Sequence, residues 1–248
     1  MGEPFLTATL YAPFASFGGL AVGERRSSER YPTRSMLIGL LGAALGVDRA
    51  DAPAQQALAR GYHFAIGIFA AGRSFTDYHT AQMPSRGKTR YATRREELAA
   101  PELNTVLTSR DYRSDFLAGL AVTAAPGAPY TLEALAAALR APHYTLSLGR
   151  KSCAFGLPLE PALGEYADAP AALAAVWDAR GSNSEKSKLF KALASRPAAP
   201  PQMVMDTALV PPGLNHTIEF LRDQPLSRQR WQFALREVAV LHPQGAAS

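Results

Sequence analysis

The sequence of 248 residues predicts an α+β fold, and two kinds of apolar spacing carry this prediction. Every second residue is apolar around 62–69 and 116–122, as expected for half-buried strands. Apolar residues recur three or four positions apart at 36–45 and 131–140, as expected for helices with one buried face. With 47% hydrophobic residues, the chain can bury one large core or two small ones.

The first predicted strand and helix follow from composition and spacing. Residues 5–11 are rich in β-branched and aromatic side chains, which favour a strand. Residues 36–45 place apolar side chains on one helical face. Thr33 or Ser35 can cap the first turn of this helix, and Gly46 can end it.

Five further elements complete the predicted core. They are a short helix at 51–60, strands at 62–69 and 116–122, a helix at 131–140 and a strand at 144–148. Apart from the short helix, the order is strand, helix, strand, strand, helix, strand. This is the ferredoxin-like arrangement found in RNA-recognition folds. Because that topology supports many unrelated functions, it predicts a fold and no activity.

Two segments interrupt the compact pattern. Residues 73–113 separate two core strands by far more than a hairpin needs, so they are predicted to project as an arm. Residues 180–201 are polar and then proline-rich, which predicts a flexible loop. Beyond them, 203–210 and 231–241 are predicted strands. The predicted organisation is therefore a core at 1–155, interrupted by the arm, and a C-terminal extension at 156–248 that packs on the core.

The overall composition excludes several classes of protein. Lys and Arg exceed Asp and Glu by 26 to 21, and a net charge of +5 is only a weak indication of a polyanionic partner. Cys153 is the single cysteine, so neither an intramolecular disulfide nor a cysteine-rich zinc site can form. No secretory signal and no apolar run of membrane-spanning length is present. We expect a cytoplasmic protein with no membrane contact, metal or other cofactor.

Three basic groups are candidate phosphate-binding sites. The densest lies in the predicted arm, where no acid occurs among Arg86, Lys88, Arg90, Tyr91, Arg94 and Arg95. Several cations on one track bind phosphates, and an interleaved aromatic ring can stack on a base. A solvated charged loop is the alternative interpretation, because Glu96 and Glu97 follow closely and can neutralise part of the charge.

The other two basic groups are smaller. Arg25, Arg26, Arg30 and Arg34 precede the first helix, where Arg34 and Ser35 lie at a helix N-terminus that favours an anion. Surface arginines beside a helix cap would give the same pattern. Arg150 and Lys151 follow a flexible glycine, but they lack the GxxxxGK[ST] spacing of a nucleotide-binding loop. A plain basic turn is the alternative there.

One cluster has acid–base character, the run Asp77-Tyr78-His79-Thr80. A histidine with a cation nearby is what metal-independent RNA cleavage requires. A histidine after a strand is more commonly a packing or hydrogen-bonding residue. The chain has no GxSxG, HExxH or paired-carboxylate motif, its other histidines lack metal-ligand spacing, and Cys153 is expected to be a buried structural thiol.

Several segments, in order from about residue 5 to 240, resemble the CasD family of type I-E CRISPR Cascade. Residues 30–46 are similar to the signature PTRSxxxGLLGAxLG of that family. The other similarities are to the DYHT, LGR[RK]SC…PL, RDxP and QFxxRE elements, at 77–80, 144–159, 222–225 and 232–237. The chain departs from the family at 12–18, where Ala15 replaces the glutamine of GPxQAWG, and 163–200 show no match.

The resemblance implies a RAMP-type ferredoxin-like core with a protruding β-hairpin thumb. It implies a role in antiviral defence as a non-catalytic subunit that holds the 5′ handle of CRISPR RNA. The implied protein partners are the CasC backbone subunit and the CasA large subunit, with target DNA reached through the assembled complex. With the basic groups above, the expected RNA-binding residues are Arg25, Arg26, Arg34, Ser35, Tyr78, His79, Arg86, Lys88, Arg90, Tyr91, Arg110, Arg150 and Lys151.

Two other classes of function stay open. A related subfamily in type I-C systems processes precursor RNA, so the chain could be a metal-independent endoribonuclease with His79 as its acid–base group and Tyr78 and a lysine in support. A protein-only scaffold would instead assemble normally without RNA. Incubation with repeat RNA in EDTA separates the first alternative from RNA binding alone.

Overall fold

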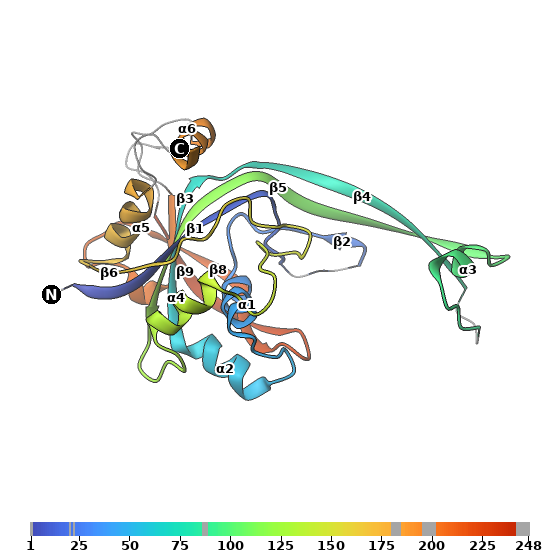
Figure 1. Ribbon diagram of the computed structural model, residues 1–248, viewed down its shortest axis with the longest axis horizontal. Coiled ribbons are helices and arrows are strands. Elements are labelled where there is room, and N and C mark those ends of the chain that lie inside the picture. Colours follow the sequence, from blue (N-terminus) through green and yellow to red (C-terminus); the bar gives the residue numbers. More distant parts are fainter. Residues whose placement is uncertain are drawn as a thin grey trace.

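A computed structural model describes residues 2–19, 21, 23–85, 89–179, 185–194 and 202–241. A twisted, largely antiparallel sheet carries helices on both faces, and two of its strands extend far beyond it as an arm (Figure 1). Within the described residues the sheet has nine strands. Seven of them follow the order β6-β1-β5-β3-β7-β9-β8, and the other two, β2 and β4, pair with β5 outside this order. This architecture confirms the predicted α+β class.

The elements have the following bounds. The strands are β1 (Glu3–Ala15), β2 (Arg25–Arg26), β3 (Tyr62–Ala70), β4 (Arg73–Pro84), β5 (Leu103–Ala124), β6 (Ala162–Tyr166), β7 (Gln202–Met205), β8 (Thr217–Ser227) and β9 (Gln232–Leu241). The helices are α1 (Arg34–Leu45), α2 (Ala52–Gly61), α3 (Arg94–Leu98), α4 (Leu132–Arg140), α5 (Ala169–Asp178), α6 (Glu185–Leu193) and the 3-10 turn η1 (Thr207–Leu209).

Helices α1 and α4 cover one face of the sheet, and α5 covers the other (Figure 1). The α1 and α4 side of the core receives alternate side chains of β3 and β5, including Phe64, Ile66 and Leu120. Thr33 caps α1 by accepting a hydrogen bond from the Met36 amide, and the left-handed Gly46 ends the helix. The predicted strand faces and both helix caps are therefore confirmed.

The predicted strand at 144–148 is wrong. This segment makes one isolated bridge, from Ser147 to Ala154, and the strand that pairs with the outer edge of β1 is β6, further along the chain. The Tyr144 amide instead donates to a carbonyl at the end of α1, at 3.1 Å. The apolar alternation arises because Leu146 and Leu148 are buried in the core as parts of a loop.

The C-terminal half departs from the predictions in three places. Part of the predicted flexible loop 180–201 is a helix, α6, whose Phe190 is fully buried against Trp177; residues 180–184 and 195–201 lie outside the described residues. The predicted strand 203–210 ends early, because β7 gives way to η1. Strand β8 was not predicted, since it is a charged edge strand interrupted by a bulge. Strand β9 occurs as predicted.

A cluster of buried charges joins the C-terminal strands to the rest of the sheet. Asp206 pairs with Arg34 on one side and with Arg236 Nη1, at 2.9 Å, on the other. Arg236 also binds Asp223 through two nitrogens, at 2.7 and 3.1 Å. Asp223 in turn accepts the backbone amide of Arg34 at 2.6 Å. The four side chains thus link the start of α1 to η1, β8 and β9.

Backbone groups around β3 supply further hydrogen bonds to this buried charge cluster, in which the Nε atom of Arg34 is buried without a hydrogen-bond partner among the described residues. The second guanidinium nitrogen of Arg34 donates to the carbonyls of Ala59 and Tyr62, at 3.0 and 2.8 Å. The amide of Phe64 donates to Asp206 at 3.0 Å. Buried charges are tolerated when they are paired and hydrogen-bonded in this way, and removing one partner leaves the other uncompensated.

Asp206 stays ionised inside the protein. Burial on its own raises the pKa of this carboxyl group, but the hydrogen bond from His63 and the charges of Arg34 and Arg236 outweigh burial and hold the pKa below its ordinary value. A carboxyl group with a lowered folded-state pKa stabilises the fold above its unfolded pKa, and that stabilisation is lost as pH falls through the folded value.

We expect Asp206→Asn to lower the free energy of unfolding by about 3–5 kcal/mol at neutral pH, because two buried guanidinium groups lose their shared anion. The loss should shrink as pH falls below about 4, where the carboxyl group of the unfolded chain becomes protonated, and should be smallest below the lower pKa of the folded state. Urea unfolding at several pH values measures both effects. The matched control is Glu237→Gln, which changes an exposed carboxylate on β9 next to Arg236. An equal loss in the control would show that the buried charge cluster is not the cause.

Candidate RNA interface

The arm is a two-stranded ribbon formed by β4 and the first half of β5, with α3 at its tip (Figure 1). Twelve residue pairs join the strands, from Arg73 with Ser114 to Pro84 with Leu103. Gly72 starts the arm with a φ of 68°, and a Cβ there would lie 2.0 Å from the carbonyl oxygen of Ser114. Glycine is therefore required at the point where the chain turns from β3 into the arm.

The two faces of the arm carry different side chains, because neighbouring residues in a strand point to opposite sides. Directly paired residues share a face, so Asp77, His79 and Arg110 lie on one side. Tyr78 lies on the other side and is 61% exposed. His79 Nε2 is hydrogen-bonded to Asp77 Oδ2. The DYHT element therefore presents its aromatic ring and its histidine to opposite faces.

Cations gather at the base of the arm from three separate segments. Strand β2 runs beside β5 and sets Arg26 next to Arg110. Arg150, from the loop after residue 148, donates to the carbonyls of Arg26 and Asp111 at 2.7 and 3.0 Å. Among the described residues, the side chain of Arg110 has neither a hydrogen-bond nor an ion-pair partner. Arginines held together without equal negative charge favour a polyanionic ligand.

Asp111 anchors the arm base. Its carboxylate accepts Thr76 Oγ1 at 2.7 Å and Arg25 Nη2 at 3.1 Å. The Thr76 hydrogen bond and the charges of Arg25 and Arg150 together lower the pKa of this carboxyl group. Asp111 and Asp77, which is paired with Arg110 across the ribbon, are two carboxylates among the four arginines Arg25, Arg26, Arg110 and Arg150, so the base keeps an excess of positive charge.

The loop that delivers Arg150 depends on a glycine. Gly149 has a φ of 98°, and a Cβ there would lie 1.8 Å from the Ser16 carbonyl oxygen. The Arg150 guanidinium then lies 4.7 Å from the centre of the Tyr112 ring, a cation–π contact. Cys153 ends the loop as the predicted buried thiol, and burial raises its pKa.

The structure separates the predicted RNA-binding residues into groups. Arg26, Arg110 and Arg150 meet at the arm base and Arg25 lies on its opposite face with Asp111, whereas Tyr78 and His79 lie further along the arm. Arg90 and Tyr91 are exposed near its tip. Arg86 and Lys88 lie outside the described residues. Arg94 pairs with Glu97, so part of the tip charge is neutralised, as the alternative interpretation of that group supposed.

Arg34 does not face solvent as a phosphate ligand would. Its side chain is 8% exposed and its guanidinium is occupied by Asp206 and two carbonyls. The sequence could not distinguish this role, because an arginine at a helix N-terminus suits an anion from inside the protein as well as one from outside. The prediction of Arg34 as an RNA contact is therefore corrected to a role in the buried charge cluster.

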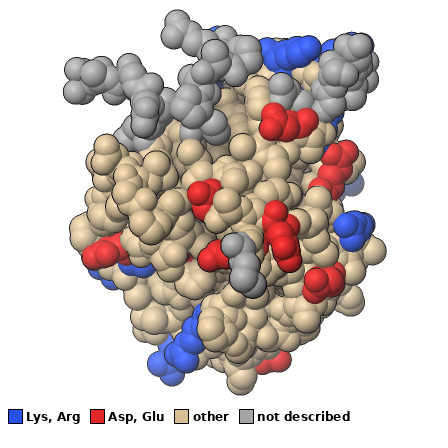
Figure 2. Space-filling model, turned by 90° about the vertical axis from the view of Figure 1, so that its left-hand side faces the viewer, with Lys and Arg blue, Asp and Glu red and all other residues tan. Residues whose placement is uncertain are grey.

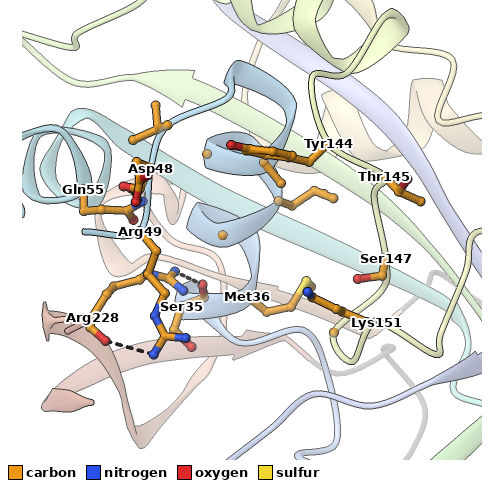
Figure 3. Close-up of a pocket in the computed structure, with 16 residues that line it drawn as sticks. Ser35, Met36, Asp48, Arg49, Gln55, Tyr144, Thr145, Ser147, Lys151 and Arg228 are labelled. Carbon is orange, nitrogen blue, oxygen red and sulfur yellow. Dashed lines mark hydrogen bonds between the residues drawn. The ribbon is translucent and has the colours of Figure 1, made fainter. Parts of the chain in front are cut away.

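A second basic feature is a groove of about 790 Å³ along α1. Its floor is the glycine-bearing face of the helix, around Gly39 and Gly42 (Figure 3). Lys151 and Ser147 line one side, and Arg49 and Arg228 line the other. Ser35, a predicted site residue, also lines it. Sequence reasoning missed Arg49 and Arg228, because each is a single arginine outside any basic run.

The face of the molecule opposite the arm differs from the arm base. Figure 2 shows acidic and basic side chains scattered there over a mainly uncharged surface. In the part of the chain that the structure describes, no group of three or more histidine, cysteine or carboxylate side chains could hold a metal ion. No described helix is long and apolar enough to cross a membrane.

The family assignment follows from comparison with known proteins. Residues 5–239 match a family described as CRISPR-associated protein (Cas_Cas5). The CRISPR system Cascade subunit CasD of Escherichia coli (strain K12) is 31% identical over 163 residues, which cover 62% of this chain and 69% of the relative. The chain therefore belongs to the Cas5 family of CRISPR-associated proteins, and its resemblance to CasD is confirmed.

Solved structures support the same fold. A chain of a CRISPR RNA-guided surveillance complex superposes with a TM-score of 0.60 at 22% identity, covering 97% of this chain and 90% of the other. A structure described as a Cas protein gives a TM-score of 0.53 at 20% identity, covering 95% and 94%. At these identities the similarity concerns the fold, and it extends over nearly the whole chain.

We expect Gly149→Ala to displace the loop that carries Arg150. Residue 149 has a left-handed φ, and the added methyl group would lie 1.8 Å from the Ser16 carbonyl oxygen. The cost should be about 1–3 kcal/mol of stability, measured by thermal or urea unfolding. Gly18→Ala is the control, since a Cβ there would meet nothing within 4 Å. If both variants unfold alike, the close approach to Ser16 does not determine the loop position.

Proposed function

We propose that this chain is a non-catalytic subunit of a CRISPR surveillance complex and that it holds the 5′ handle of CRISPR RNA. The observation that carries the proposal is the arm base, where Arg26, Arg110 and Arg150 converge from three segments. Family membership supports it, because relatives of this chain are described as parts of an RNA-guided surveillance complex and of Cascade.

The contacts at the arm base suit a sugar–phosphate backbone. Arg110 is unpaired among the described residues, and Arg25 is 72% exposed despite its pairing with Asp111. The Arg150 guanidinium lies over the ring of Tyr112, which is buried, so this contact fixes the cation at the arm base. Tyr78 is exposed on the opposite face of the arm, where it offers a ring to a base that passes around the ribbon.

The finer architecture belongs to the same proposal. The order β6-β1-β5-β3, with α1 and α4 between these strands in the chain, supports a ferredoxin-like core. The arm of β4 and β5 corresponds in this proposal to the thumb of the family. The CasC backbone subunit and the CasA large subunit are the proposed protein partners, with target DNA engaged through the assembled complex. The arm and the exposed β8 edge are surfaces on which such partners could dock.

We expect Arg110→Ala and Arg150→Ala each to weaken RNA retention, because each removes a cation from the phosphate track. The slope of log affinity against log salt should fall in magnitude by about 0.7 per lost contact with a single strand. Fluorescence anisotropy with labelled repeat RNA over a range of salt measures this. Arg140→Ala, at the exposed end of α4, is the matched control. Unchanged slopes in both test variants, or a complex that assembles normally without RNA, would contradict the proposal.

A second candidate function rests on the hydrogen bond between His79 and Asp77. A carboxylate that orients an imidazole is an arrangement used in general acid–base catalysis. The side chains are 41% and 45% exposed, so a substrate could reach them. The alternative proposal is a metal-independent endoribonuclease that processes CRISPR precursor RNA. Tyr78 cannot assist His79 directly in this reaction, because its side chain points to the opposite face of the arm.

We expect the purified protein not to cleave repeat RNA in EDTA. The RNA affinities of the wild type and His79→Ala should agree within about threefold, because the variant loses at most one weak contact. Denaturing gel electrophoresis of end-labelled RNA measures cleavage. Thr80→Ala, next to His79 on the arm, controls for damage to the ribbon. Clean cleavage by the wild type and Thr80→Ala that disappears in His79→Ala would establish the endoribonuclease instead.

A further inference from the structure

Two arginines from distant segments lie side by side at one end of the groove along α1. Arg49 Nη2 donates to the Arg228 carbonyl at 3.2 Å, and Arg228 Nη2 donates to the Ser35 carbonyl (Figure 3). The Nε atom of Arg228 is buried and has no hydrogen-bond partner. A Cβ at Gly39 would approach the Arg228 guanidinium within 3.3 Å, so the helix glycine makes space for this group.

Neither arginine of this pair forms an ion pair with a described residue, and Asp48 is the acid that lines the same groove. Among the described residues, neither arginine has a carboxylate oxygen within 4.0 Å. The pKa of Arg228 is lowered by burial and by the positive charge of Arg49. Two guanidinium groups that repel each other at the edge of a groove are stabilised by an anion that bridges them. Arginine binds phosphate in this manner through paired N–H donors.

An exposed tryptophan adjoins the arginine pair. Trp231 follows the β8–β9 turn, is 64% exposed and has a φ of 53°, which is strained for a tryptophan. The Arg49 guanidinium lies 3.9 Å from the centre of its ring. The large exposed fraction shows that much of the indole remains open to solvent. Strained and exposed residues of this kind gather at ligand sites.

The groove is continuous with the proposed RNA site through two adjacent residues. Arg150 reaches the arm base, whereas its neighbour Lys151 lines the far side of the groove from Arg49. Ser147 and Thr145 lie on the Lys151 side and Ser35 lies beside Arg228, with Met36 and α1 between the two sides. A strand that leaves the arm base past Arg150 therefore meets Lys151 and its neighbouring hydroxyl groups, crosses the apolar floor, and then reaches the arginine pair.

We infer that the end of the groove binds one nucleotide of single-stranded RNA, with its phosphate between Arg49 and Arg228 and its base stacked on Trp231, which lies outside the groove against Arg49. The inference rests on the proposed function, because it places part of the same RNA in a second site. Stacking on an indole tolerates any base, so Trp231 contributes affinity and position here and no sequence preference.

The two tryptophans of the chain make the test direct. Trp177 packs between Phe69 and Phe190, remote from the groove, so Trp177→Phe leaves Trp231 as the only tryptophan. We expect single-stranded repeat RNA to quench the fluorescence of Trp177→Phe saturably, and to leave that of Trp231→Phe unchanged. Trp231→Ala should weaken RNA binding by about 5- to 100-fold, the range for loss of one stacked base, and Trp231→Phe should retain most of the affinity.

The arginine pair supplies an independent readout. Arg49→Gln should weaken binding and reduce the salt slope by about 0.7, as loss of one phosphate contact requires. Leu235→Ala, an exposed apolar change on the same hairpin, is the control and should bind as the wild type does. Arg110→Ala should lower affinity at the arm base while leaving the Trp231 quenching intact once RNA is saturating.

The outcomes separate this inference from the proposed function. If RNA binds with the salt dependence expected of the arm base, but Trp231 fluorescence and the affinity of Trp231→Ala do not change, the groove site is overturned and the proposed function stands. If the wild-type protein and its assembled complex retain no RNA, both are overturned. Quenching by a protein partner in the absence of RNA would also overturn the groove site and assign Trp231 to a protein interface.

Discussion

The buried charge cluster of Arg34, Asp206, Asp223 and Arg236 is the interaction on which the remainder of the structure depends. It joins the first turn of α1 to strands that lie about two hundred residues later in the chain. The β8–β9 hairpin also packs on the core through Val238 and Val240, and the cluster adds the buried polar link between this hairpin and α1. Because every member is paired, the cluster imposes one arrangement and disfavours alternatives.

Arginine side chains have two different roles in this protein, and the role depends on the groups around each of them. Arg34 and Arg236 are enclosed by carboxylates and hold elements together, whereas Arg110 and Arg49 have no carboxylate within ion-pair distance among the described residues. The PTRS, RDxP and QFxxRE segments meet in the interior through Arg34, Asp223 and Arg236. The DYHT and LGRKS segments lie at the arm. The resemblance by motif therefore combines residues that build the fold with residues that face a ligand.

Much of the fold could be predicted from the sequence, because buried faces leave a periodic pattern. The strands around Phe64 and Leu120 and helices α1 and α4 follow from this pattern, whereas the arm follows from the length of the segment between two core strands. The segment 144–148 was wrongly predicted as a strand, because its two buried leucines alternate in a loop as they would in a strand. Strand β8 gave no pattern, since its charged residues serve the buried cluster. Arg49, Arg228 and Trp231 could not be grouped, because only the folded chain brings them together.

The length of the arm makes its attachment mechanically demanding. Twelve paired residues at about 3.3 Å each give a projection of about 40 Å. A rotation of about 5° at such a base moves the tip by about 3.5 Å, enough to lose a hydrogen bond. The obligatory glycine at position 72, the left-handed Asp115 opposite it and the bonds to Asp111 therefore act where a small error is most amplified. Accuracy at the tip is determined by a few atoms at the pivot.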